Sequence, residues 1–355
     1  MYFPTIRLLE TELRFLNSIP LQTWQFIEPR LIIKPDKLLE NKDREKIEDK
    51  INQFFGGLSI IPRSGPPFII DSEPHKWTYE SAKAFLSFST KLKFGKHRVL
   101  PVFDTNMLPI VGTSSFVNIC KTSGKIGFRY HLDANRHDYF SDTVLACSRT
   151  SAPVVYIVDV GDISQSKQRE YARAKSSAII EWIRSVSRSS EIILHGAAFP
   201  KSLGKEMGEK RLMRFPRHEL ALFKELAAKA GPHFHFGDFG AKNPSFGEHA
   251  PPPKLHRGTI RYTSEANYLV ARGDPNPNVN RAQYSELSRA ILTSEEFRGE
   301  SFGRAEREIC KVADGRQEAK APRFWSGLSL LQHLQITEMV LRDYSYAEGW
   351  ESIAI

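Results

Sequence analysis

The feature that most constrains the fold is a regular alternation of two kinds of segment through the first two thirds of the chain. Short runs rich in Val, Ile, Leu and Phe alternate with longer windows whose apolar residues recur at helical spacing. Such alternation is typical of β-α units that build a parallel sheet. Eight strand-like runs can be counted, at residues 2–8, 26–33, 67–71, 98–104, 125–132, 152–160, 191–199 and 233–239.

The number of runs favours a closed barrel over an open sheet. Eight units in about 240 residues match the size of a (β/α)₈ barrel, whereas an open doubly wound sheet more often uses five or six strands. No glycine-rich nucleotide-binding motif follows any of the runs. The sequence therefore predicts an α/β fold, a TIM-barrel-like single domain, over residues 1–245.

The last third of the chain has a different pattern. A proline-rich stretch at 247–254 is followed by two strand-like pieces at 259–263 and 268–271, which resemble a hairpin. Helical spacing then returns at 282–293, 305–312 and 328–342. We expect residues 255–355 to form a β-hairpin and helices that pack on the barrel.

Composition is ordinary for a globular protein, with 41% apolar and 26% charged residues, and no apolar run is long enough to span a membrane. Glu10 and Glu12 interrupt the apolar N-terminus, which is therefore not typical of a secretion signal. We expect a cytoplasmic location without membrane contact. Cys120, Cys147 and Cys310 are an odd number at wide spacing, which favours reduced core thiols over disulfides or a zinc site.

The formal charge of +9 and the pI near 9.3 make a polyanionic partner plausible, such as a nucleic acid or a phosphorylated ligand. The basic residues are, however, dispersed, and the local concentrations at 201–217 and 304–320 are interleaved with acidic residues. A solvated basic surface is the alternative interpretation.

Polar residues at the ends of the predicted strands are candidates for catalysis, because barrel active sites lie at the carboxyl ends of the strands. Several carboxylates at one rim could hold Mg²⁺, and a histidine among them could transfer protons. The candidates of this kind are Asp104, Asp159, His195 and Asp238. The alternative is structural: aspartates at strand ends often cap helices or form turns, and His195 could be a neutral core residue.

Arginines on or beside the strands are candidates for binding an anionic substrate, since guanidinium groups suit phosphate and carboxylate. These candidates are Arg7, Arg129, Arg261 and Arg272. Each could instead pair with a carboxylate at the rim.

A series of short motifs occurs in an order and spacing that resembles a known family. The motif residues are Tyr2, Pro4, Arg7, Glu12, Leu16 and Pro29 near the start, Pro101 in VLPVFD, Arg129 in GFRYHL, Asp159 in YIVDVGDI, His195 in LHGAAFP, Asp238 in FGDFG, Arg261 in RYT, Arg272 in VARG, and Trp325 and His333 near the end. Together they are similar to the beta family proteins, called after a bacteriophage beta protein. The segment FGRAE at 302–306 departs from the family pattern, which has a Gly-Asp pair there.

The resemblance implies a barrel-like fold and a setting among phage-related or defence genes, but it implies no particular reaction. Two functional hypotheses follow. The first is a metal-assisted enzyme that acts on a phosphorylated or nucleic-acid substrate. The second is a non-catalytic module that binds nucleic acid or a protein partner encoded by a neighbouring gene of a phage-related defence system.

Overall fold

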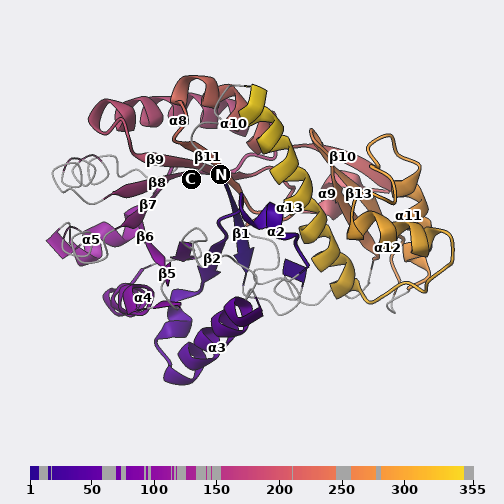
Figure 1. Ribbon diagram of the computed structural model, residues 1–355, viewed down its shortest axis with the longest axis horizontal. Helices are drawn as coiled ribbons and strands as arrows, with labels where there is room; N and C mark the ends of the chain where they lie inside the picture. The colour runs from indigo at the N-terminus through magenta and orange to yellow at the C-terminus, as the bar shows by residue number, and fades with distance from the viewer. Residues whose placement is uncertain are drawn as a thin grey trace.

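A computed structural model of the chain shows a closed barrel with helices on its outside (Figure 1). It describes residues 1–7, 15–16, 18–57, 69–72, 77–91, 93–94, 97–112, 114–115, 117, 125–132, 141, 145, 153–209, 211–244, 257–276 and 281–347. Cys120 and Cys147 lie outside these residues, so the interpretation of both as core thiols stays a prediction.

Eight strands form the barrel, and each is paired in parallel with both of its neighbours. They are β1 (Tyr2–Arg7), β2 (Arg30–Ile33), β3 (Ile69–Ser72), β6 (Leu100–Asp104), β7 (Ile126–His131), β8 (Val154–Asp162), β9 (Glu191–Ala197) and β11 (Phe234–Asp238). Their order around the barrel follows their order in the chain, and β11 closes the barrel on β1. The predicted (β/α)₈ barrel is confirmed, with one strand from each predicted run.

Helices and short elements connect the strands. They are α2 (Leu21–Trp24), the 3₁₀ helix η1 (Pro35–Leu38), α3 (Asn41–Gly57), α4 (Tyr79–Lys91), the short hairpin β4 (Lys93–Phe94) and β5 (His97–Arg98), the 3₁₀ helix η2 (Thr105–Met107), α5 (Leu108–Val111), α8 (Ser166–Val186), α9 (Leu203–Met207) and α10 (His218–Ala230). Local sequence sets some of the ends. Gln165 and Gln168 form a reciprocal capping box at the start of α8, and Gly231 ends α10 with a φ of 82°, which glycine adopts easily.

A second, smaller sheet lies beside the barrel (Figure 1). Its strands are antiparallel in the order β10-β13-β12, with β10 (Leu212–Pro216), β12 (Thr259–Thr263) and β13 (Asn267–Arg272). The predicted hairpin is β12-β13, whereas β10 comes from the segment between β9 and α10 and was not predicted. Three helices accompany this sheet: α11 (Gln283–Leu292), α12 (Arg304–Ala313) and α13 (Pro322–Ala347). The long helix α13 runs between the barrel and the small sheet and contacts both β1 and β12.

Alternate residues of each barrel strand point inward, as the period of two in a strand requires. Inward residues of β1, β3, β6, β8 and β9 form one apolar cluster, which we call the apolar layer: Phe3, Ile69, Leu100, Val102, Val155, Ile157 and Ile193. A glycine completes it, because a Cβ at Gly237 would lie 2.9 Å from both the backbone oxygen of Phe3 and Cδ2 of His195. The outward residues pack against the helices in the main hydrophobic core.

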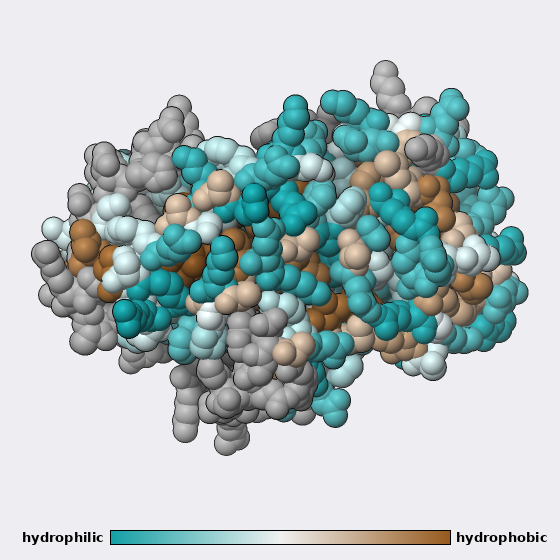
Figure 2. Space-filling view, turned by 90° about the horizontal axis from the view of Figure 1, so that it is seen from above, coloured by the Kyte–Doolittle hydropathy of each residue, from teal (hydrophilic) through white to brown (hydrophobic). Residues whose placement is uncertain are grey.

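The surface in Figure 2 shows hydrophilic side chains projecting over most of the described face, with hydrophobic residues lying lower between them. No helix among the described residues is both long enough and apolar enough to cross a membrane. Cys310 is buried in α12 and is not part of a disulfide, as expected for a core thiol.

Candidate active site

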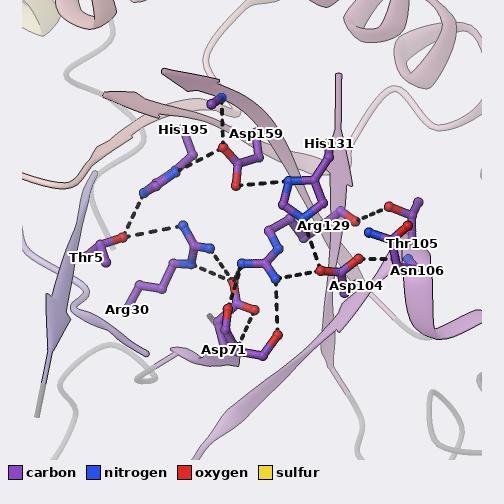
Figure 3. A network of polar contacts seen from close by, with 12 residues as sticks. Thr5, Arg30, Asp71, Asp104, Thr105, Asn106, Arg129, His131, Asp159 and His195 are labelled. Carbon is purple, nitrogen blue, oxygen red and sulfur yellow. Dashed lines mark hydrogen bonds and ion pairs between the residues drawn. The ribbon is translucent and has the colours of Figure 1, made fainter. Parts of the chain in front are cut away.

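A ring of polar side chains lies at the carboxyl ends of the barrel strands, directly beyond the apolar layer (Figure 3). Seven of the eight strands contribute to it, because each places an inward position at this level. We call it the polar ring: Thr5, Arg30, Asp71, Asp104, Arg129, His131, Asp159 and His195.

Two guanidinium groups share the carboxylate of Asp71. Its Oδ2 accepts hydrogen bonds from Nε of Arg30 at 2.6 Å and from Nη1 of Arg129 at 3.1 Å. Its Oδ1 accepts the backbone N–H of Ser72 at 2.6 Å. Arg129 is also bound to Ser72 itself, through the carbonyl oxygen at 2.9 Å and Oγ at 3.1 Å. Asp71 therefore holds both arginines in fixed positions.

Asp104 links Arg129 to His131. Its Oδ2 accepts Nη2 of Arg129 at 2.7 Å and lies 3.0 Å from Nε2 of His131. Its Oδ1 accepts the backbone N–H of Asn106 at 2.7 Å, which fixes the turn into η2. The other ring nitrogen of His131, Nδ1, lies 3.5 Å from Oδ2 of Asp159. His131 is thus placed between two carboxylates.

Asp159 and Thr5 connect the rest of the polar ring through His195. Oδ1 of Asp159 accepts the backbone N–H of Gly161 at 3.0 Å and lies 3.7 Å from Nδ1 of His195. The opposite nitrogen of His195, Nε2, is 2.7 Å from Oγ1 of Thr5. Thr5 Oγ1 in turn accepts Nη1 of Arg30 at 3.4 Å, so its hydroxyl hydrogen is available for Nε2 of His195. The contacts close into a circuit around the barrel mouth (Figure 3).

Phe239, just past the end of β11, covers part of this circuit. Its ring meets the His195 ring edge-on with centroids 4.5 Å apart, and the guanidinium of Arg30 lies 6.0 Å from its centroid. An aromatic cover of this kind lowers the local dielectric and strengthens the charge pairs beneath it.

The pKa values of the polar ring show how strongly the groups are coupled. Burial would raise the pKa of Asp159, but His195, His131 and Arg30 hold it well below its usual range. Burial opposes ionisation of Asp104 too, yet Arg129 and His131 lower its pKa. Burial and the charge of Arg30 lower the pKa of His195, so this imidazole is neutral near pH 7. Asp104 and Asp159 are ionised near pH 7, and His195 is not.

His131 is the one member of the polar ring that is in substantial contact with solvent. Its side chain is 20% exposed, whereas the other seven members are buried. It is therefore the polar-ring group that a substrate entering the described mouth of the barrel can touch.

The structure brings Asp104, Arg129, Asp159 and His195 together in the polar ring, but it does not bring Asp238 to them. The inward positions on either side of it belong to Gly237 and Phe239, so Asp238 points outward from the barrel, toward α13. Its Oδ1 accepts the hydroxyl of Tyr2 at 2.8 Å, and its Oδ2 lies 2.9 Å from Nε2 of His333.

Asp238 belongs to a second buried network that joins the barrel to the extension. Nδ1 of His333 lies 3.1 Å from the hydroxyl of Thr263 on β12, and Nη2 of Arg217 lies 3.7 Å from Oδ2 of Asp238. Although burial opposes its ionisation, His333 and Arg217 lower the pKa of Asp238 to about 2. Burial lowers the pKa of His333, so a neutral ring donates Nε2–H to Asp238 and accepts from Thr263.

The remaining predicted arginines lie apart from the polar ring. Arg7, at the end of β1, donates Nη2–H to the carbonyl oxygen of Pro244 at 2.6 Å. Arg261 on β12 lies over the Phe199 ring, 5.0 Å from its centroid. Arg272, at the end of β13, lies beside Gly204 of α9. The latter two belong to the small sheet.

Four members of the polar ring were not among the predicted site residues: Thr5, Arg30, Asp71 and His131. Asp71 ends a predicted strand, as Asp104 does, and carried the same signal. Arg30 carried another: a basic residue at the start of the apolar run RLII must either face solvent or meet a buried acid. Thr5 gave no signal, because threonine is common in strands.

The carboxylates of the polar ring do not fit the expected Mg²⁺ site. Oδ2 of Asp71 already accepts two guanidinium groups, and Oδ2 of Asp104 faces Arg129 and His131. A cation would have to displace these positive groups. The described residues also contain no group of three His, Cys, Asp or Glu side chains placed to hold a metal ion.

Fold and site together define a (β/α)₈ barrel protein with a largely buried polar ring at the carboxyl ends of its strands. The sequence profile of the Beta protein family matches residues 2–337, nearly the whole chain, so this chain belongs to that family. No curated protein matches the chain.

Proposed function

We propose that this protein is an enzyme whose active site is the carboxyl-terminal mouth of the barrel, with His131 as its general acid–base residue. The observation that carries the proposal is the contrast between two adjoining parts of one barrel interior. The apolar layer holds only hydrocarbon side chains, whereas the polar ring directly beyond it holds three carboxylates, two guanidiniums and two imidazoles.

A purely structural role does not explain this contrast. Burying a charge costs on the order of several kcal/mol per ion, and apolar side chains of similar volume often give a protein that is equally stable or more stable. The apolar layer shows that this barrel can fill its interior with hydrocarbon. The polar ring lies at the end of the barrel where enzymes with this fold place their catalytic groups. Charged groups that are buried at this end of the barrel, at a cost in folding free energy, therefore support the proposal of a catalytic role.

One buried nitrogen of the polar ring supports the same conclusion. Nε of Arg129 has no hydrogen-bond partner within the described part of the chain. Buried polar atoms of this kind are uncommon in folded proteins, and they are found where water or a ligand completes the network.

His131 is suited to proton transfer by its position. A neutral imidazole can donate to only one of the two carboxylates beside it, at 3.0 and 3.5 Å, whereas a protonated ring can donate to both. Asp104 and Asp159 thus orient the ring and stabilise the proton it gains during a reaction. They are positioning residues, as is His195 through Asp159.

The substrate class we propose is phosphorylated, nucleotides and nucleic acids included, because the formal charge of the chain is +9. Membership of the Beta protein family fits a phage-related setting. We propose that the reaction takes part in a phage-related process, such as defence against phage. The cation expected from the sequence has no role in this proposal, since Asp71 and Asp104 are paired with arginines.

The test is a screen with a matched pair of histidine variants. Purified protein is incubated with single- and double-stranded DNA and RNA, nucleotides and phosphate esters, with Mg²⁺ and with chelator, and both turnover and retention are measured. Conversion should fall by about 10²- to 10⁴-fold in His131→Gln, the usual contribution of general acid–base catalysis. His218→Gln, at the start of α10, should retain full activity.

Other outcomes would redirect the proposal. Full activity in His131→Gln would remove its catalytic role. Retention of nucleic acid without any turnover, weakening steeply with salt, would favour the non-catalytic binding module.

A further inference from the structure

We infer that one face of helix α8 binds single-stranded nucleic acid and leads it to the mouth of the barrel, an inference that rests on the proposed function and names its substrate class. The face consists of three exposed side chains, which we call the α8 stripe: Lys167, Tyr171 and Lys175. They are four residues apart, so they lie above one another on successive turns of the helix.

Tyr171 is the aromatic centre of the α8 stripe. It is 49% exposed, and its hydroxyl forms no hydrogen bond within the part of the chain that the structure describes. The exposed Ala174 and Ala178 lie beside it, so no long side chain covers the ring from that flank. An exposed ring of this kind is a platform for a base of a single strand, because every base has a flat π surface.

The two lysines give the α8 stripe its charge. Both are exposed, and neither forms an ion pair with any described residue. Nζ of Lys175 lies 5.9 Å from the centroid of the Tyr171 ring. A phosphate group bound to Lys175 would therefore lie beside a base that stacks on Tyr171, and Lys167 offers a second cation one turn away on the other side.

The charge around the α8 stripe has the same sign. Helix α8 contains five basic and two acidic residues. Arg169 and Arg173 share the single carboxylate of Glu225 on α10, at 3.1 and 3.0 Å, which leaves an excess of positive charge next to the stripe. Of the two acids on α8, Glu170 adjoins the stripe, and Glu181 lies further along the helix, bound to a serine. A local excess of positive charge attracts a polyanion.

The α8 stripe leads to the candidate active site. Helix α8 follows β8, whose carboxyl end carries Asp159 of the polar ring. Because the helix of a β-α unit returns along the outside of the barrel, the first turn of α8, with Lys167, is the turn nearest the mouth (Figure 1). From Lys167 to Lys175 the stripe is about 12 Å long, at about 1.5 Å per residue. A strand bound along it would present its next nucleotides to His131.

The stacking position favours a single strand over the other polyanions. In a duplex the flat surfaces of the bases are covered by their neighbours, so the Tyr171 ring can reach only an unpaired base. An acidic protein segment would pair with the lysines but would leave the exposed ring without a partner. The combination of one open ring and two unpaired lysines fits a base with its flanking phosphates.

The experiment measures binding of fluorescein-labelled oligothymidylate and oligouridylate of about 15 nucleotides by fluorescence anisotropy, with an abasic strand of the same length for comparison. The variants are Tyr171→Ala and Tyr171→Phe, which keeps the ring. Tyr79→Ala is the matched control, because Tyr79 is 58% exposed and also has a lysine, Lys83, near its ring, but lies on α4, three strands away around the barrel. Circular dichroism melting checks that each variant is folded.

We expect Tyr171→Ala to bind both base-carrying strands about 5- to 150-fold more weakly than wild type, the usual effect of losing one stacked base. Tyr171→Phe and Tyr79→Ala should bind as wild type does. The abasic strand should bind the wild type more weakly and should not distinguish it from Tyr171→Ala.

The lysines are tested by the dependence of the affinity on salt. Lys167→Met and Lys175→Met should each reduce the slope of log affinity against log salt concentration by about 0.7, the contribution of one phosphate contact with a single strand. Lys229→Met, at an exposed lysine of α10, should leave the slope unchanged.

Three results would overturn the inference. They are equal affinity of wild type and Tyr171→Ala for the base-carrying strands, equal affinity of the wild type for abasic and base-carrying strands, and polyglutamate binding as tight as that of the oligonucleotides, which would indicate an acidic protein partner. His131→Gln separates this inference from the proposed function. It should bind the strands as wild type does, because His131 is not on α8. Where the α8 stripe fails but His131→Gln still loses turnover, the proposed function stands without it.

Discussion

Replacing Asp238 with Asn should destabilise the protein by an amount that depends on pH. In the wild type Asp238 accepts hydrogen bonds from Tyr2, His333 and Gly240, and Arg217 lies 3.7 Å away. These groups lower its pKa from 3.8 to about 2 despite full burial. At about 1.4 kcal/mol per pKa unit, this shift corresponds to roughly 2–3 kcal/mol in favour of the ionised side chain.

The sign follows from the direction of the shift. A depressed pKa adds stability above pH 4, where the unfolded chain is also ionised, and this contribution disappears as the pH falls through about 2. The difference in unfolding free energy between wild type and Asp238→Asn should therefore be largest near neutral pH and should shrink between pH 4 and pH 2.

Urea unfolding followed by tryptophan fluorescence at several pH values measures this difference. Asp274→Asn is the matched control, because Asp274 pairs with Arg211 on the surface and is 65% exposed. Surface pairs of this kind are worth about 0–1 kcal/mol. A difference for Asp238→Asn that stays below about 0.5 kcal/mol, or that does not change with pH, would refute the assignment of Asp238 to a stabilising network.

Two further predictions concern stability at the opposite face and inside the barrel. Burial raises the pKa of Glu28 to about 8, so the stability that its protonated form contributes is lost as the pH rises from 4.5 towards 8. Glu28→Gln should therefore unfold at a higher urea concentration than wild type at pH 8, but not at pH 4. The exposed Glu45→Gln is the control and should match wild type at both pH values. Gly237→Ala should lose about 1–3 kcal/mol of unfolding free energy, because its Cβ would meet the Phe3 backbone and the His195 ring; unchanged stability would show that the barrel interior can relax there.

The barrel was predictable because its signals are local. Each strand is a short apolar run, and each confirmed helix has a 3.6-residue apolar spacing, so no long-range information was needed. Strand β10 shows the limit. Its sequence LMRFP begins in a basic segment and ends in a proline, so it does not resemble a strand. It forms one only by pairing with β13, more than 50 residues further along the chain. Such a partner leaves no local signal.

The candidate site was predictable where the sequence indicated which alternate residues of a strand face the interior of the barrel. Asp104, Arg129, Asp159 and His195 share the inward face at the carboxyl ends of their strands, where the sequence placed them. Asp238 points the other way because the inward face of β11 carries His235 and Gly237. Both faces of a barrel strand are buried, so hydrophobicity alone does not tell which residues face the interior.

The C-terminal extension is tied to the barrel by the second buried network. Helix α13 supplies His333, whose Nε2 lies 2.9 Å from Oδ2 of Asp238 at the end of β11. Through Tyr2, that network also holds strand β1, which carries Thr5 and Arg7 at the mouth of the barrel. A mutation that loosens α13 should therefore disturb Thr5 and its contact with His195, even where it touches no residue of the polar ring.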